Sequence, residues 1–225
     1  DSTLVAVWGR DKEKAKTFAE QWNILPFTDV QEMIEQANVD AVIITTPHPL
    51  HKEHAILALK AGAHVLVEKP MALTVEDCDA MIETAKQEKK LLAVISQRRW
   101  YPACRRIRDA IDTGKLGTPM IGQVTMLGWR DEEYYKSDPW RGSWDKEGGG
   151  VLINQAPHQL DLLHWFLGEV KEVYAQWDNV NHPYIEVEDT AVATIRFASG
   201  AVASILVSNS QKPGIYAKVH VHGSS

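Results

Sequence analysis

The stretch "AGAHVLVEKP", residues 61–70, decides how this chain folds. Its middle, residues 64–67, is a short apolar run typical of a strand buried in a parallel sheet. Glu68-Lys69-Pro70 ends the run abruptly. The residue before a proline is pushed toward extended geometry, so we expect Lys69 to point onward from the strand tip, where parallel sheets bind ligands. The alternative is a surface lysine that happens to precede a proline.

The sequence around this strand alternates short apolar runs with helical patterns. The pattern predicts strands at residues 3–9, 39–47, 64–70 and 91–97, and helices at 11–22, 31–36, 51–62 and 74–90. Thr74 and Asp77 form a capping box at the start of the last helix. Such alternation is typical of a Rossmann-like parallel sheet covered on both faces, which we assign to residues 1–98.

The second part of the chain has a different sequence pattern. A helix is predicted at 104–114, and strand-like stretches follow at 119–129, 170–180, 189–200, 201–210 and 216–223, with a hairpin signal at Ser199-Gly200. A loop rich in Trp, Tyr, Asp and Gly leads to a helix after residues 148–150. We therefore predict an α+β domain with an open, mostly antiparallel sheet at residues 99–225.

Composition narrows the functional classes. The 225 residues carry a net charge of −6, which argues against a nucleic-acid surface. The basic run at 97–108 is interpreted as a solvated helix face with a few side chains toward a ligand. No apolar run approaches the ~18 residues of a membrane span, and no signal peptide is seen. Cys78 and Cys104 are too few for a disulfide framework, so we expect a cytoplasmic protein.

Two long motifs, at residues 40–86 and 148–168, make the sequence similar to a known family. The chain resembles the glucose-fructose oxidoreductase, inositol dehydrogenase and MocA (Gfo/Idh/MocA) oxidoreductases, whose hallmarks are strand-Glu-Lys-Pro and a Gly-rich turn before a helix with a catalytic histidine. The resemblance implies reversible hydride transfer between NAD(P) and a carbinol of a sugar, sugar derivative or polyol. It also implies a homo-oligomer assembled through the second-domain sheet.

Carried over to this sequence, Lys69 matches the motif lysine and His158 the catalytic histidine. We expect the two to form an acid–base pair across a shared cleft. A histidine base typically contributes about 10²–10⁴-fold to a rate. One helix is predicted to carry Asn154, His158 and Asp161 on a single face. On the residues alone, a lone helical histidine is often structural.

Position 154 departs from part of the family. The polyol dehydrogenases carry aspartate there. Asn154 cannot stabilise an imidazolium by charge, but it can hydrogen-bond a substrate hydroxyl or the nicotinamide amide. The asparagine form resembles members that act on pyranosides or nucleotide sugars, often at ring carbon 3. The candidate substrate-binding residues are Lys69, Arg98, Tyr135, Asn154 and His158.

The end of the first strand indicates the coenzyme. Where NAD-specific folds place an acid, this chain has Gly9 followed by Arg10, which favours NADP; if Asp11 shifts inward, NAD is the alternative. No metal site is predicted from the three-residue spacing of His48, His51 and His54. The candidate cofactor contacts are Gly9, Arg10, Thr45, Thr46, Pro47, His51, Glu68, Lys69, Gln97, Trp140 and Arg141.

The glycine fingerprint that cradles a pyrophosphate is not found in the sequence. We therefore expect this chain to be an internal piece of a longer protein, lacking ~30 residues in front, the size of one strand–loop–helix unit. By itself it is expected to be inactive and to bind a dinucleotide weakly. Two other functions remain open: an enzyme that processes glycosides through transient sugar oxidation, and a non-enzymatic nucleotide-binding sensor.

Overall fold

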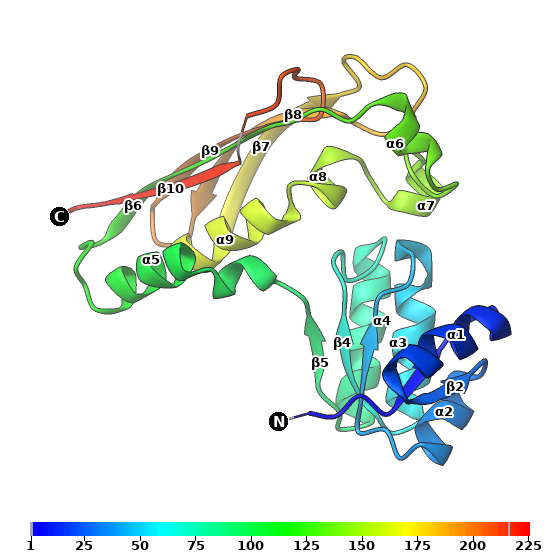
Figure 1. Ribbon diagram of the computed structural model, residues 1–225. Coiled ribbons are helices and arrows are strands. Elements are labelled where there is room, and N and C mark those ends of the chain that lie inside the picture. The colour runs from blue at the N-terminus through cyan, green and yellow to red at the C-terminus, as the bar shows by residue number, and fades with distance from the viewer. Residues whose placement is uncertain (1, 216) are drawn as a thin grey trace. The chain divides into compact units, whose positions relative to one another are not determined.

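The computed structural model describes residues 2–215 and 217–225 and divides the chain into two compact units, residues 1–95 and 96–225. The first unit is a parallel α/β unit and the second carries a mostly antiparallel sheet, as predicted (Figure 1). No helix in the described residues is both long and apolar enough to cross a lipid bilayer.

The first unit holds two parallel sheets, ordered β1-β2 and β3-β4-β5. Parallel pairing in both sheets is what a doubly wound α/β unit requires. The short strand β2 was not predicted. The elements are β1 (Ala6–Trp8), α1 (Lys12–Trp22), β2 (Leu25–Phe27), α2 (Val30–Gln36), β3 (Ala41–Ile44), the 3₁₀ turn η1 (His48–Leu50), α3 (His51–Lys60), β4 (His64–Val67), α4 (Val75–Gln87) and β5 (Leu92–Val94).

Small residues bring helix α3 close to the three-stranded sheet. Ala55 and Ala58 are fully buried, and they share one core with Val67 and Met81. The side chain of Ile43, on the face of β3 opposite α3, is 62% exposed. Among the described residues, α3 and α4 cover one face only. The alternating residues of β3 could not reveal this, since both sets are apolar.

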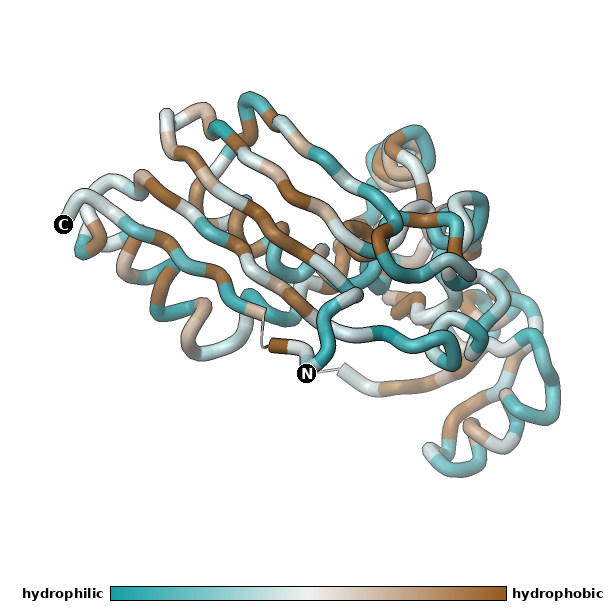
Figure 2. Tube along the Cα trace, turned by 90° about the horizontal axis from the view of Figure 1, so that it is seen from above, coloured by the Kyte–Doolittle hydropathy of each residue, from teal (hydrophilic) through white to brown (hydrophobic). Residues whose placement is uncertain are grey.

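The second unit is built on one five-stranded sheet, ordered β10-β6-β9-β8-β7. Only the β6–β9 pair is parallel. Figure 2 shows hydropathy alternating along these strands, as expected for a sheet with one covered face. The elements are η2 (Gln97–Trp100), α5 (Pro102–Asp112), β6 (Pro119–Leu127), α6 (Glu132–Lys136), α7 (Trp144–Glu147), α8 (Val151–Asn154), α9 (Pro157–Leu167), β7 (Val170–Asp178), β8 (Thr190–Phe197), β9 (Val202–Ser208) and β10 (Lys218–Gly223).

Helix α9 covers the inner face of this sheet. Leu163 and Phe166 pack with Val124 and Ile205 in the core. Gly122 on β6 permits the close approach, because a Cβ atom there would lie 2.6 Å from the methyl groups of Leu163 and Leu167. The outer face has no such cover among the described residues.

A charged pair joins α9 to the segment before α5. Arg99 donates to both carboxylate oxygens of Asp161, at 2.9 and 2.6 Å, and its guanidinium lies 5.4 Å from the ring of Trp165. A bidentate pair of this kind fixes geometry as well as adding energy. Asp161, predicted to lie on the face of the catalytic histidine, is therefore engaged in holding the unit together.

Candidate active site

Lys69 follows strand β4 after one intervening residue, Glu68, at the carboxyl end of the parallel sheet. The amide of Glu68 donates to the carbonyl of Ile44 at 2.9 Å, which extends the β3–β4 pairing by one step. The carboxylate of Glu68 accepts from the amide of Lys69 at 3.0 Å. The Lys69–Pro70 peptide is cis. The main chain that carries the lysine is thus fixed on the side facing β3.

His51 ties the loop after β3 to the loop after β4. Its ring is fully buried, with Nδ1 2.8 Å from the carbonyl of Pro70 and Nε2 2.8 Å from the carbonyl of Thr46. The predicted direct contact with a cofactor does not fit this position, because both ring nitrogens face main-chain oxygens. The ring instead sets the spacing of the loops that bear Thr46 and Lys69.

The loop after β1 contains the residues predicted to decide the coenzyme. The amide of Gly9 donates to the carbonyl of Phe27 at 3.0 Å, and the side chain of Arg10 is exposed. The carboxylate of Asp11 caps helix α1 by accepting from the amides of Glu13 and Lys14, at 3.0 and 3.1 Å. The Asp11 carboxylate is therefore engaged in hydrogen bonds to the first turn of α1.

A glycine-rich turn, residues 148–150, precedes the histidine motif in the second unit. Gly148 ends α7 in the left-handed region, with φ of 83°. Gly150 lies so close to the main chain of Glu188 that a Cβ atom would collide with its carbonyl oxygen. The Glu188 carboxylate accepts from the amides of Gly150 and Leu152, at 2.8 and 3.0 Å, and so caps the short helix α8.

The prediction of one continuous helix after this turn is wrong. Helix α8 ends at Asn154 and α9 begins at Pro157, so Asn154 and His158 lie on different helices. Proline suits the first position of α9 because it has no amide hydrogen to donate to the preceding turn. His158 lies in the first turn of α9 and is partly buried.

Tyr134 is the centre of a polar network that sequence reasoning missed. Its hydroxyl oxygen lies 2.8 Å from Arg141 Nη1, 2.9 Å from Gln155 Nε2 and 3.2 Å from Asn154 Nδ2. The guanidinium of Arg141 contacts two rings, with its central carbon 4.3 Å from the ring centroid of Trp140 and 4.4 Å from that of Tyr134. The network brings together three predicted residues, namely Trp140, Arg141 and Asn154.

Tyr135, the residue predicted to bind substrate, lies deeper than its neighbour. It is 8% exposed, and its hydroxyl accepts from Asn209 Nδ2 at 3.3 Å. Burial raises the pKa of its phenol, despite that hydrogen bond. The ring packs edge-on against those of Tyr134 and His182. The sequence "EEYY" does not show which tyrosine faces inward. Helix α6 has only five residues, too few for a periodic pattern that would identify its buried face.

Glu147 is a second functional candidate that the sequence analysis missed. It is 1% exposed, and its carboxylate accepts from the amide of Gly142 at 2.6 Å and from Asn154 Nδ2. Burial raises the pKa of this carboxyl, against the effect of those bonds and of Arg141. An acid directly before a glycine-rich turn is the signal that could have found it.

A buried Ser-His-Asp cluster supports the loop beneath Tyr135. Asp189 accepts from His182 Nδ1 at 2.5 Å and from Ser210 Oγ at 2.6 Å. Burial opposes its ionisation, but these bonds and two main-chain amides lower its pKa to about 2. The arrangement is not that of an activated nucleophile, because Ser210 donates to the aspartate and His182 Nε2 faces the carbonyl of Arg130 at 2.8 Å. The cluster is structural.

Two further candidates, Gln97 and Arg98, lie in η2. Gln97 is exposed. Arg98 donates through Nη1 to the side-chain oxygen of Gln159, whose amide nitrogen donates in turn to the carbonyls of Gln155 and Ala156. Arg98 therefore also braces the start of α9, where His158 lies.

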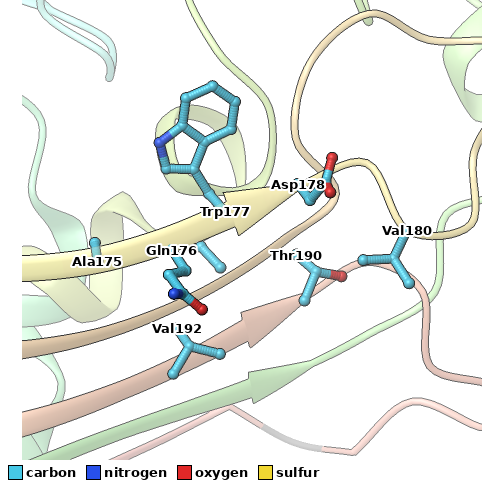
Figure 3. A pocket seen from close by; sticks show the side chains of 8 residues that line it. Ala175, Gln176, Trp177, Asp178, Val180, Thr190 and Val192 are labelled. Carbon is cyan, nitrogen blue, oxygen red and sulfur yellow. The ribbon is translucent and has the colours of Figure 1, made fainter.

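A hollow of about 490 Å³ lies at one end of β7 and β8 (Figure 3). Its lining contains none of the residues predicted to bind cofactor or substrate. It is formed by Ala175, Gln176, Trp177, Asp178, Val180, Thr190, Ala191 and Val192.

Comparisons with known proteins give the same division of the chain. Residues 1–96 match the oxidoreductase family with an NAD-binding Rossmann fold, and residues 104–225 match the GFO/IDH/MocA C-terminal domain. The chain is 31% identical over 202 residues to 1,5-anhydro-D-fructose reductase of Ensifer adhaerens, covering 89% of this chain and 60% of that protein. It is 30% identical to myo-inositol 2-dehydrogenase of Thermotoga maritima, covering 100% and 66%.

A solved structure supports the same relationship. The WlbA dehydrogenase of Bordetella pertussis, in complex with NADH and UDP-GlcNAcA, superposes with a TM-score of 0.90 at 34% identity. The match covers 98% of this chain and 68% of that one. The chain thus spans about three fifths to two thirds of the length of these three relatives. From its two matched domains and this likeness, the chain belongs to the Gfo/Idh/MocA family of oxidoreductases.

Proposed function

We propose that the full-length protein transfers a hydride between NAD(P) and a carbinol of a sugar, sugar derivative or polyol. Lys69 stabilises the developing alkoxide, and His158 accepts and returns the hydroxyl proton. The relatives that support this class act on anhydrofructose and on inositol, or bind a nucleotide sugar with NADH. The substrate side chains are Lys69, Arg98, Tyr135, Asn154 and His158.

The observation that carries this proposal is the way the structure holds Lys69. Its main chain is held by Glu68 and its loop is joined by His51 to the loop after β3. A surface lysine without a function needs no such bracing, whereas a cation that meets a reacting atom must be held in place. The test is a panel of sugars and polyols with each coenzyme, scored by the absorbance of reduced nicotinamide. Absence of turnover with the whole panel would refute the proposal.

We further propose that NADP is preferred to NAD, with Arg10 facing the 2′-phosphate. Asp11, the residue that would otherwise contact a ribose hydroxyl, is occupied in capping α1. The other cofactor contacts in the proposal include the loops after β3 and β4 and the Trp140-Arg141 pair. The cysteines, Cys78 and Cys104, are free thiols, which suits the cytoplasm that we propose as the location.

Replacing Arg10 with alanine in the full-length enzyme is expected to lower kcat/KM for NADP about 10- to 100-fold, because a charged hydrogen bond to phosphate is lost. Activity with NAD should change little. Initial rates with both coenzymes give the ratio of kcat/KM for NADP to kcat/KM for NAD. Lys12, exposed at the start of α1, provides the control substitution Lys12→Ala. Equal losses with NADP and NAD would contradict this assignment.

The outer face of the five-stranded sheet is the surface that we propose for self-association. It exposes apolar side chains on adjacent strands, with Val192 at 51%, Val202 at 42% and Leu206 at 39% exposed. Apolar patches on a sheet face commonly mark subunit contacts. Light scattering of the full-length protein should give a dimer or larger. We expect Leu206→Glu to shift it toward a monomer, and a wild-type monomer would overturn the proposal.

A further inference from the structure

The buried carboxylate of Glu147 determines which way the Asn154 amide is turned. One carboxylate oxygen accepts from the main-chain amide of Gly142 at 2.6 Å, and the other faces Asn154 Nδ2. The hydroxyl of Tyr134 lies 3.2 Å from the same Nδ2 atom. A main-chain N–H can only donate and an ionised carboxylate can only accept. The nitrogen side of the Asn154 amide is therefore held toward Glu147, and its carbonyl is directed the opposite way.

We propose that Glu147 is a positioning residue that makes Asn154 offer a hydrogen-bond acceptor to a hydroxyl of the sugar substrate. This inference rests on the proposed function, because it assigns the polarity of one substrate contact. An asparagine alone can present either a donor or an acceptor. With Glu147 beneath it, Asn154 presents the polarity of an aspartate without placing a charge against the substrate. The substrates that fit are those that donate a hydroxyl proton at this position.

The substitution Glu147→Gln should reverse this polarity without removing volume. The introduced amide must turn its oxygen toward the fixed N–H of Gly142, so its NH₂ group then faces Asn154. Asn154 has to rotate to meet that donor, and its own NH₂ replaces its carbonyl on the substrate side. A substrate hydroxyl loses its acceptor. We expect kcat/KM to fall about 10- to 100-fold, the usual range for one misplaced hydrogen bond at a buried site.

A second substitution should restore the acceptor. Asn154→Asp alone places two carboxylates in contact inside the protein, which disfavours their ionised forms and should lower both stability and kcat/KM. In the double variant Glu147→Gln/Asn154→Asp, the introduced amide donates to the introduced carboxylate. The second carboxylate oxygen then accepts from the substrate. We expect the double variant to exceed both single variants in kcat/KM and in melting temperature.

The experiment is this double-mutant cycle in the full-length enzyme, measured twice. Thermal unfolding without substrate reports the contact itself, and steady-state kinetics report its effect on turnover. Glu133→Gln on α6 is the control, because Glu133 is exposed. Recovery of both quantities in the double variant supports the inference. Recovery of the melting temperature without kcat/KM shows a purely structural contact and overturns it, and so does recovery of neither.

A failure of the proposed function would be recognised by a different observation from a failure of the inference about Glu147. It is seen as an inactive wild-type enzyme across the sugar panel, before any variant is compared, and the inference would then fall with it. A wild-type enzyme that turns over, combined with additive effects of the two substitutions, refutes the inference alone.

Discussion

Replacing Lys69 with methionine in the full-length enzyme is expected to lower kcat about 100- to 1,000-fold, the range for removing one preorganised group that stabilises developing charge. Methionine keeps most of the side-chain length and removes the ammonium. Coenzyme affinity should change far less, because the loop is held by contacts of Glu68 and His51 that do not involve the ammonium. Turnover is followed by reduced-nicotinamide absorbance, and coenzyme binding by tryptophan fluorescence.

Two further variants sharpen this test. Lys69→Arg retains the cation but changes its shape, so it should recover part of the lost rate. Lys60→Met removes an exposed lysine at the end of α3 and should leave turnover unchanged. If Lys69→Met turned over at the wild-type rate, the lysine would be a surface residue and the proposed mechanism would be wrong.

His158→Asn should have an effect of similar or greater size. Loss of a general base lowers rates by about 10²–10⁴-fold. In the direction of alcohol oxidation, a protonated imidazole cannot accept the hydroxyl proton, so the wild-type rate should fall on the acid side. The variant should lose that dependence on pH along with its activity. Profiles of kcat/KM against pH for both proteins measure the change.

The matched control lies on the same helix. His164 is exposed near the end of α9, and His164→Asn should leave rate and pH profile intact. If Lys69 and His158 act on the same proton and oxygen, the double variant Lys69→Met/His158→Asn should be little slower than the slower single variant, since groups acting as a unit are not additive. If the fold losses in rate of the two single variants multiplied in the double variant, Lys69 and His158 would act independently of each other.

Much of the fold followed from local patterns in the sequence. The apolar run before Lys69 predicted β4, and the predicted cap of α4 is present, with Thr74 Oγ1 accepting from the amide of Asp77 at 3.1 Å. The tight turn at Gly200, with φ of 89°, joins β8 to β9 as the hairpin signal indicated. Patterns of this kind are readable because they depend on neighbours a few residues away.

Short helices and the ends of helices and strands were harder to predict from the sequence. Helices α6, α7 and α8 have five, four and four residues, too few for a periodic pattern. The histidine motif predicts one helix across Pro157. In the structure the chain forms two helices there, and Pro157 is the first residue of the second helix, α9. At strand β5 the apolar run predicts a strand that continues to residue 97, whereas the strand ends at Val94 and Gln97 begins a 3₁₀ turn.

Contiguous residues were enough to predict most of the succession of helices and strands along the chain, the lysine after strand β4 and the histidine motif. The contacts of three side chains became visible only in the folded chain. His51 joins two loops, Tyr134 rather than Tyr135 lies at the polar network, and Glu147 contacts Asn154. Each of these contacts joins separate elements or loops. The polarity of a buried amide is set by whichever donors and acceptors the fold brings against it, and the spacing of residues along the chain does not specify those.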